Sequence, residues 1–210
     1  MTDKMQKKLD NGREYRSMVL EVRAAANDDE MIVEGYATTF NQPYTLYEYG
    51  NYRVLEQVDA RAFDECDMDD VIFQYDHEGR VFARTRNKTL ELTIDKKGLL
   101  IKADLGGTDE GKKLYQEIKG GYTDKMSFGF VVGESKREYT EDNENGTETC
   151  LRTITKISKL YDVSAVSIPA NDMTSISARK FSDGVISELE AERLHREKKK
   201  KLRLLLEVTK

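Results

Sequence analysis

Alternation of apolar and polar side chains dominates this chain and predicts a body built mainly of β-strands. Met18, Leu20 and Val22 alternate with Ser17, Val19 and Glu21, which is the period-two pattern of a half-buried strand. Apolar stretches of strand length recur along the body at residues 31–39, 53–58, 71–75, 125–133, 149–156 and 159–168. Pro169 is expected to end the last of these strands.

Two segments carry clear local signals of a hairpin and of a helix. The alternation over 90–94, the turn Lys96-Lys97-Gly98 and the return over 99–105 predict a β-hairpin. Residues 108–119 are expected to be helical, because Thr108 can cap the first turn and Gly120-Gly121 can end the last. The remaining expectations are a short helix at 60–66, a loop with several tyrosines at 42–52 and a charged loop at 134–148.

The end of the chain differs in character from the body. From Ser182 onward, Glu188, Glu190 and Glu192 come early and the basic run 198–201 comes late, a charge order that suits the helix dipole. Ser187 and Glu190 fit a capping box. The predicted organisation is a charged N-terminal segment at 1–14, one domain at 15–181, and a charged helical tail at 182–210 with little core of its own.

Composition narrows the class of protein. The 210 residues carry a net charge of −5, which argues against a nucleic-acid-binding protein. Cys66 and Cys150 are the only cysteines, and with no apolar signal segment at the N-terminus they are expected to be free thiols in a reducing compartment. No apolar run has the length of a membrane span, so no membrane contact is expected.

Three residues spread along the chain suit acyl-transfer chemistry. His77 follows the apolar strand 71–75, Ser127 begins the strand at 126–132, and Asp162 interrupts an otherwise apolar run. A serine hydroxyl needs a base to take its proton, histidine titrates near neutral pH, and a carboxylate behind the imidazole stabilises the imidazolium. A buried carboxylate is costly unless it is paired. Together the three residues predict a serine hydrolase.

Simpler interpretations stay open at this level. A serine in a strand is usually structural, a histidine after Asp76 is often a turn residue, and Asp162 could face solvent on an edge strand. No Gly-x-Ser-x-Gly elbow is present, which excludes an α/β-hydrolase. Two distant histidines and no Cys-x-x-Cys pair predict neither a metal site nor a cofactor. Cys150, just after a polar loop, reads as a strand residue more readily than as a nucleophile.

Six short segments, taken in order, resemble the prohead (capsid-maturation) proteases of tailed bacteriophages. They are Glu34-Gly35-Tyr36-Ala37 with Phe40-Asn41, Glu56 with Ala62-Phe63, Asp76-His77, Leu90-Glu91-Leu92 through Gly98-Leu99, Met126-Ser127-Phe128-Gly129-Phe130, and Val163-Ser164-Ala165-Val166 with Pro169-Ala170-Asn171. Arg61 departs from the resemblance, since the family often has glycine there. The resemblance covers roughly residues 15–180.

The resemblance implies a serine endopeptidase with a fold of the α+β class: a mainly antiparallel β-barrel flanked by helices, like herpesvirus assemblin, with a C-terminal helical tail. By matching motif, His77 is the base, Ser127 the nucleophile and Asp162 the third member, although Asp76 could compete for the imidazole. The implied substrates are scaffold or the scaffolding segment of the major capsid protein, and the protease itself. The implied place of action is the immature capsid in the host cytoplasm, and a homodimer is expected only by analogy of fold.

A different class of protein also fits the charge and the tail. A non-enzymatic assembly or scaffold protein would use the tail to dock on partner helices. It would tolerate Ser127→Ala and His77→Ala, whereas a protease would lose all cleavage. An esterase on the same fold would hydrolyse small esters without cutting protein.

Overall fold

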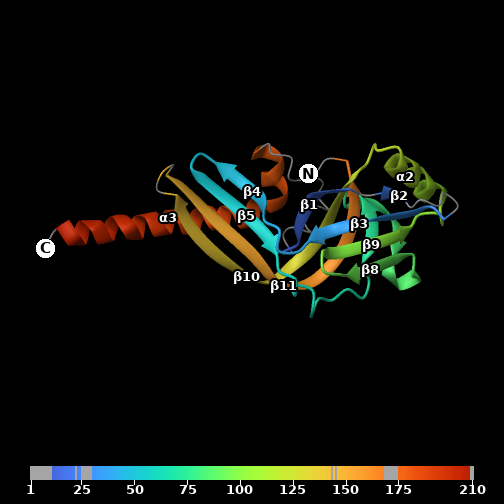
Figure 1. Cartoon of the computed structure of the whole chain (residues 1–210), viewed down its shortest axis with the longest axis horizontal. Coiled ribbons are helices and arrows are strands. Elements are labelled where there is room, and N and C mark those ends of the chain that lie inside the picture. The colour runs from blue at the N-terminus through green and yellow to red at the C-terminus, as the bar shows by residue number, and fades with distance from the viewer. Residues whose placement is uncertain are drawn as a thin grey trace.

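A long antiparallel pair of strands, β10 (Lys125–Asp142) and β11 (Thr147–Val166), connects the body with an extension beside α3 (Figure 1). The computed structural model describes residues 11–21, 23–24, 30–142, 144, 146–167 and 175–208. Register shifts between Gly129 and Ser135 interrupt the pairing of β10 with β11. Such irregularities increase the local twist. They divide the pair into a part inside the body and an arm, which is formed by residues 135–142 of β10 and 147–154 of β11.

The larger sheet is assembled around this pair. Its described strands follow the order β1-β10-β11-β5-β4, and β6 pairs with β11 while β7 pairs with β6. The strands are β1 (Glu14–Glu21), β4 (Tyr44–Tyr49), β5 (Tyr52–Val58), β6 (Ile72–Tyr75) and β7 (Glu78–Arg84). β11 pairs in parallel with β5 near its start and with β6 near its end. The β6–β7 hairpin therefore lies beside the body end of the long pair.

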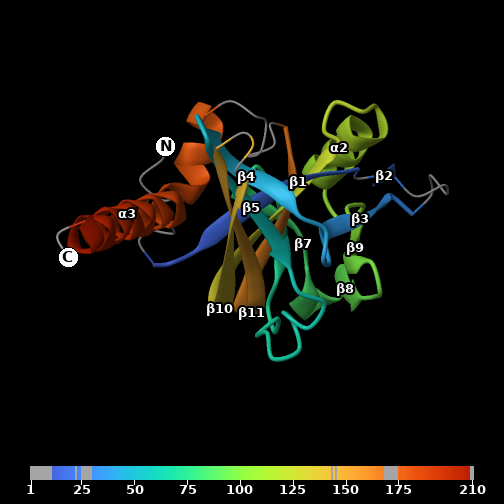
Figure 2. The same ribbon diagram turned by 60° about the vertical axis from the view of Figure 1, so that its left-hand side comes forward.

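A second sheet of β2, β3, β9 and β8 and the helix α2 complete the body (Figures 1 and 2). The elements are β2 (Arg23–Ala24), β3 (Ile32–Thr39), β8 (Leu90–Ile94), β9 (Gly98–Asp104), a 3-10 turn η1 (Thr85–Asn87) and α2 (Asp109–Lys119). One main hydrophobic core joins both sheets and α2, with members such as Ile101, Leu114, Phe128 and Val163.

The α+β class with mostly strands is confirmed, but the predicted barrel is wrong. The described strands form two separate open sheets, and no closed barrel is present among them. Closure would require the edge strand β1 of the larger sheet to pair with one of its other edge strands, β4 or β7. Neither pair is present among the described strands. The expected likeness to herpesvirus assemblin stays a prediction.

The hairpin and the helix that were predicted from turn and cap residues are both confirmed. The 90–105 hairpin is present as β8 and β9, and Gly111 N donates to Thr108 Oγ1 (3.0 Å) at the predicted helix cap. The predicted helix at 60–66 is instead a series of turns, closed by bonds such as Ala62 N to Asp59 O (3.0 Å). The predicted end of the last strand at Pro169 lies outside the described residues.

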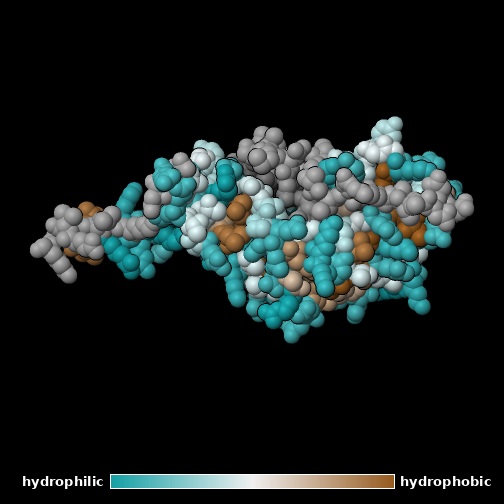
Figure 3. All heavy atoms as spheres, in the orientation of Figure 1, coloured by the Kyte–Doolittle hydropathy of each residue, from teal (hydrophilic) through white to brown (hydrophobic). Residues whose placement is uncertain are grey.

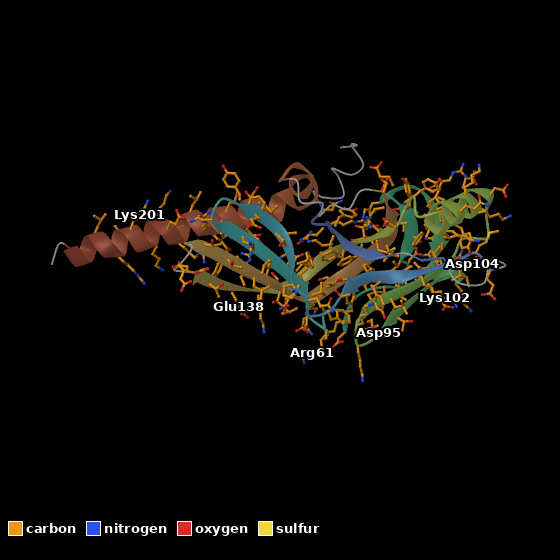
Figure 4. The ribbon with its side chains drawn as sticks, turned by 45° about the horizontal axis from the view of Figure 1, so that its top comes forward. Arg61, Asp95, Lys102, Asp104, Glu138 and Lys201 are labelled. Atoms are coloured by element: carbon orange, nitrogen blue, oxygen red, sulfur yellow. The ribbon has the colours of Figure 1, made fainter. Side chains whose placement is uncertain are left out.

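Both predicted loops are wrong, because most of their residues form hairpin strands that pair with the neighbouring stretch of the chain. Residues 44–49 form β4 on β5, with Leu46 and Tyr47 buried. Most of 134–148 continues β10 and β11, which extend as an arm; Glu138 lies on it, far from Lys102 and Asp104 at the other end of the molecule (Figure 4).

The arm is covered by α3 (Ser175–Val208), a helix that continues beyond it into solvent (Figure 1). Ile186 and Leu189 of α3 are buried in a second core cluster with Tyr52, Val54 and Cys150. Polar contacts add to this packing: Tyr139 Oη donates to Glu192 Oε2 (2.9 Å). The predicted helix at the end of the chain is confirmed over the described residues. The charge pattern did not indicate that Ile186 and Leu189 would pack into a hydrophobic cluster with the arm. No described helix is both long and apolar enough to span a bilayer.

Candidate active site

The pairing of three adjacent strands brings the predicted residues together. Ser127 of β10 lies opposite Ser164 of β11, and two residues along each strand Gly129 lies opposite Asp162. Since residues two apart on a strand share a face, Ser127 and Asp162 lie on one face of the sheet. The neighbours of Ser127, Met126 and Phe128, point the other way into the main core. Because side chains alternate along β10, packing Met126 and Phe128 into the core turns the side chain of Ser127 to the opposite face of the sheet.

His77 reaches the same face from a tight turn between β6 and β7. Asp76 (φ 48°) and His77 (φ 59°) both have left-handed backbone, and Tyr75 pairs with Glu78 across them. Positive φ at both central residues is the type I′ turn that suits a two-residue hairpin. Left-handed conformations cost non-glycine residues energy, so the surroundings must hold them in place. Ser167 is one such contact, because its backbone N (3.0 Å) and its Oγ (2.9 Å) both donate to the Asp76 carboxylate.

The three side chains form a continuous hydrogen-bonded series. His77 Nε2 lies 2.5 Å from Ser127 Oγ, and His77 Nδ1 contacts Asp162 Oδ1. Ser164 Oγ also donates to Asp162 Oδ1 (3.2 Å). The ring of Tyr15 packs edge-on against the imidazole, with centroids 4.5 Å apart. The structure therefore brings together all three predicted residues, and it places Asp162 rather than Asp76 behind the imidazole.

The site is closed to solvent. Ser127 is 0% exposed, Asp162 1% and His77 3%. Arg13, at the rim, places its guanidinium 3.8 Å from Asp162 Oδ2 and stacks on the Tyr161 ring. Burial and the nearby Asp162 charge raise the pKa of Tyr15 well above its ordinary value, so its hydroxyl stays neutral. The site holds a carboxylate beside an imidazole in a low-dielectric setting, where their interaction is strong.

Gly129 makes room for the carboxylate. A Cβ on Gly129 would lie 2.5 Å from Asp162 Oδ2 and 2.7 Å from Tyr15 Cε1, closer than any real contact allows. The sequence offered one signal for this role, a glycine inside a strand, which often marks close approach by a neighbour.

Gly129→Ala is expected to displace Asp162 from His77 Nδ1. The inserted methyl should destabilise the fold by about 1–3 kcal/mol, as for overpacked cores, and the misplaced carboxylate should lower kcat by about 10²-fold. Urea unfolding and steady-state kinetics measure the two effects. Gly107→Ala, where nothing lies within 4 Å of the added Cβ, is the matched control and should change neither. Equal behaviour of the two variants would contradict this role of Gly129.

A cluster of four charged residues, three of them buried, lies next to the site. Arg16 donates to Glu56 Oε1 from Nε (2.5 Å) and to Glu56 Oε2 from Nη2 (3.1 Å). Arg152 Nη1 donates to Glu56 Oε2 (2.5 Å) and Glu14 Oε2 (2.9 Å), and Tyr44 Oη donates to Glu56 Oε1 (2.5 Å). Burial alone would raise the pKa of Glu56, but the charges of Arg16 and Arg152 lower it from 4.5 to about 2. Sequence reasoning missed this cluster, although extending the alternation back from Met18 places Arg16 and Glu14 on one face.

The depressed pKa of Glu56 predicts a specific loss of stability in acid. A carboxyl that titrates lower in the folded chain stabilises it above the unfolded pKa, and that contribution is lost as pH falls from about 4.5 to about 2. The loss should be about 3 kcal/mol in the free energy of unfolding. Urea titrations at several pH values, for the wild type and Glu56→Gln, isolate it as the difference between the two. A difference that does not change with pH would contradict the assignment.

Other candidate groups do not join this site. Cys150 is fully buried near Tyr52 and Tyr139, and burial raises the pKa of its thiol, which suits a structural residue. Within the described part of the chain, no three His, Cys, Asp or Glu side chains are grouped so as to hold a metal ion.

A serine, an imidazole and a carboxylate joined in series form the constellation of serine hydrolases. The chain belongs to the caudovirus prohead serine protease family, whose model matches residues 18–185. The resemblance expected from the short motifs is thereby confirmed, and the family points to a serine peptidase of capsid maturation. No curated protein and no solved structure matches the chain.

Proposed function

We propose that this chain is a serine endopeptidase that cleaves scaffold, or the scaffolding segment of the major capsid protein, inside the immature phage capsid in the host cytoplasm. The hydrogen-bonded series Ser127–His77–Asp162 is the observation that carries the proposal. Family membership supports the same reaction class. Cleavage of the protease by itself, and a homodimer, belong to the proposal as implications of the family.

In the proposed mechanism His77 acts first as a base and then as an acid. Its Nε2 takes the proton of Ser127 Oγ while Oγ attacks the carbonyl carbon of a substrate peptide bond. Asp162 stabilises the imidazolium through Nδ1–H. The C–N bond breaks as Nε2–H gives its proton to the leaving amine, and Ser127 remains acylated. Water, deprotonated by His77, then attacks the ester and releases the acid and the free serine.

Co-expression with the capsid and scaffold proteins of the same phage tests this function. The wild type should shorten one of them, as read by intact mass, and Ser127→Ala should leave both at full length. Equal shortening with both chains would point to host proteases and overturn the assignment. Assembly that proceeds normally with Ser127→Ala and without any cleavage would instead support the alternative of a scaffold protein. Hydrolysis of small esters alone would indicate an esterase.

We further propose that the tail, assigned to 182–210, directs the protease into the assembling capsid or is removed there. The end of α3 projects from the body and carries basic residues such as Lys201 (Figure 4) and the exposed side chains of Leu202, Leu205 and Leu206. Some hydrophobic atoms are visible among the grey ones at that end of the molecule (Figure 3). A cut at 181 would also remove the buried Ile186 and Leu189, so a chain ending at residue 197 is the better probe.

The chain 1–197 is expected to keep its stability and its proteolytic activity while losing incorporation into capsids. The described side chains of α3 after residue 197 are exposed, and exposed surface usually contributes little to folding. The unfolding free energy should change by less than about 0.5 kcal/mol. Quantifying the protease in purified immature capsids tests the targeting role, and undiminished incorporation would contradict it.

A further inference from the structure

The nucleophile cannot meet a substrate in the arrangement seen here, because the structure covers it completely. Ser127 is fully buried, and His77 is almost so. On one side of the serine's strand lies β11, a central strand that also pairs with β5 and β6. On the other lies β1, which ends the strand order of the larger sheet. β1 is the edge strand beside the serine, so it can leave without dividing the sheet.

β1 lies where an extended peptide would lie beside the nucleophile. It pairs antiparallel with β10, with Arg16 opposite Phe128 and Ser17 opposite Ser127. The Ser127 hydroxyl donates to the carbonyl oxygen of Arg16 (3.0 Å). Addition of a strand to an open sheet edge is a common way to bind a peptide, with backbone bonds for affinity and side-chain pockets for specificity. The carbonyl that meets the serine here is that of Arg16.

The side chain of Arg16 fills a pocket built for a guanidinium. Both oxygens of Glu56 accept from it, and the Phe130 ring lies 5.7 Å from its Cζ. Two-point pairing of this kind selects Arg over Lys, since the planar fork matches a carboxylate. Glu14, two residues earlier on β1, meets Arg152 at 2.9 and 3.0 Å. β1 therefore presents acidic–x–Arg to a Glu56–Arg152 pair of the body.

We propose that β1 occupies the substrate's place on the edge of β10, and that the protease binds extended segments with arginine immediately before the scissile bond and an acidic residue two positions earlier. Glu56 is then the specificity-determining residue, and Arg16 is its internal competitor. The proposal rests on the endopeptidase function above. The reaction follows the mechanism already given, with the carbonyl carbon of the bound arginine as the atom attacked. The family match begins at residue 18 and includes neither Glu14 nor Arg16.

Two matched peptides test the proposal on the full chain. One carries the sequence Glu-Tyr-Arg-Ser-Met-Val with neutral flanks; the other replaces arginine by citrulline, which has the same shape without the charge. The wild type should cut the first peptide after arginine, with kcat/KM at least tenfold above that for the second. Glu56→Gln should remove this difference. Arg16→Met, which keeps the apolar stem but vacates the charge site, should raise kcat/KM for the arginine peptide severalfold, whereas a purely structural Arg16 predicts a fall.

Binding separates this proposal from the endopeptidase assignment. Ser127→Ala cannot turn over, so fluorescence anisotropy with labelled peptides reports the pocket alone, and it does so even if Arg16→Met does not fold. Suppose that the arginine peptide binds about tenfold more tightly but the wild type shows no Ser127-dependent cleavage. Arginine recognition by Glu56 would then be supported, and the endopeptidase activity would be refuted. Ser127-dependent cleavage without preference for arginine would keep the protease and overturn the pocket. Equal binding of the two peptides would likewise overturn the pocket.

Discussion

Ser127→Ala, His77→Ala and the double variant are all expected to lose kcat by about the same factor, on the order of 10⁶. The reason is that the hydroxyl and the imidazole act as one unit: His77 Nε2 lies 2.5 Å from Ser127 Oγ, and neither group accelerates acyl transfer without the other. Rates measured with one peptide substrate for the four chains give the comparison. KM should change little, because neither side chain supplies much ground-state binding.

Additive losses of catalytic free energy in the two single variants would contradict the view that Ser127 and His77 act together. If the double variant lost the product of the two single effects, the residues would act independently and the hydrogen bond between them would not serve the reaction. Ser164→Ala is the matched control, because Ser164 lies opposite Ser127 on the same face and bonds only to the carboxylate side of the series. Because it removes one hydrogen bond to a charged group, its loss should stay within about 10–100-fold, far below the loss at Ser127 or His77.

Asp162→Asn is expected to lower kcat by about 10⁴ while leaving the fold intact. An amide in place of the carboxylate can present its NH₂ to His77 Nδ1, which favours the tautomer with the proton on Nε2 and leaves no base facing the serine. The carboxylate is 1% exposed, so water does not replace it. Steady-state kinetics with a thermal melt for each chain separates loss of chemistry from loss of stability.

Asp76→Asn provides the matched control for this prediction. Asp76 stands next to His77 in the sequence, but its carboxylate bonds to Ser167 and not to the imidazole. Asparagine keeps acceptor capacity for Ser167 and tolerates left-handed backbone, so activity should stay within about tenfold. A larger loss from Asp76→Asn than from Asp162→Asn would reverse the assignment of the third member.

How far the sequence predicts the structure depends on how local each signal is. The 90–105 hairpin and the capped helix after Thr108 follow from turn and cap residues a few positions apart, and both are present. The arm and β4 could not be predicted this way. Their strands pair with near neighbours in the sequence, but they are also packed against distant segments, β5 on β11 and α3 on both, through contacts such as Tyr47 to Glu190 and Tyr139 to Glu192. The closed barrel was carried over from the resemblance, and pairing within this chain does not close it.

The residues of the candidate site were found by chemistry and motif, but their spacing could not show that they meet. That required the register of β10 on β11, which places Ser127 and Asp162 on one face, and the turn at Asp76 and His77. Both depend on pairing across the sheet. The buried Arg16–Glu56 pair was missed for a related reason: charged residues in a strand pattern read as solvent-facing until their partners are known.

Labelling with a small fluorophosphonate tests the central claim most directly, because the reagent phosphonylates an activated serine regardless of the natural substrate. Incubated with the full-length wild type at millimolar concentration and mapped by mass spectrometry, it should give one adduct, on Ser127. His77→Ala should label at least about 100-fold more slowly, whereas Asp76→Asn, whose position bonds to Ser167, should stay within about tenfold of the wild type. An adduct on another serine, no adduct at all, or labelling of Ser127 at the same rate without His77 would contradict the account.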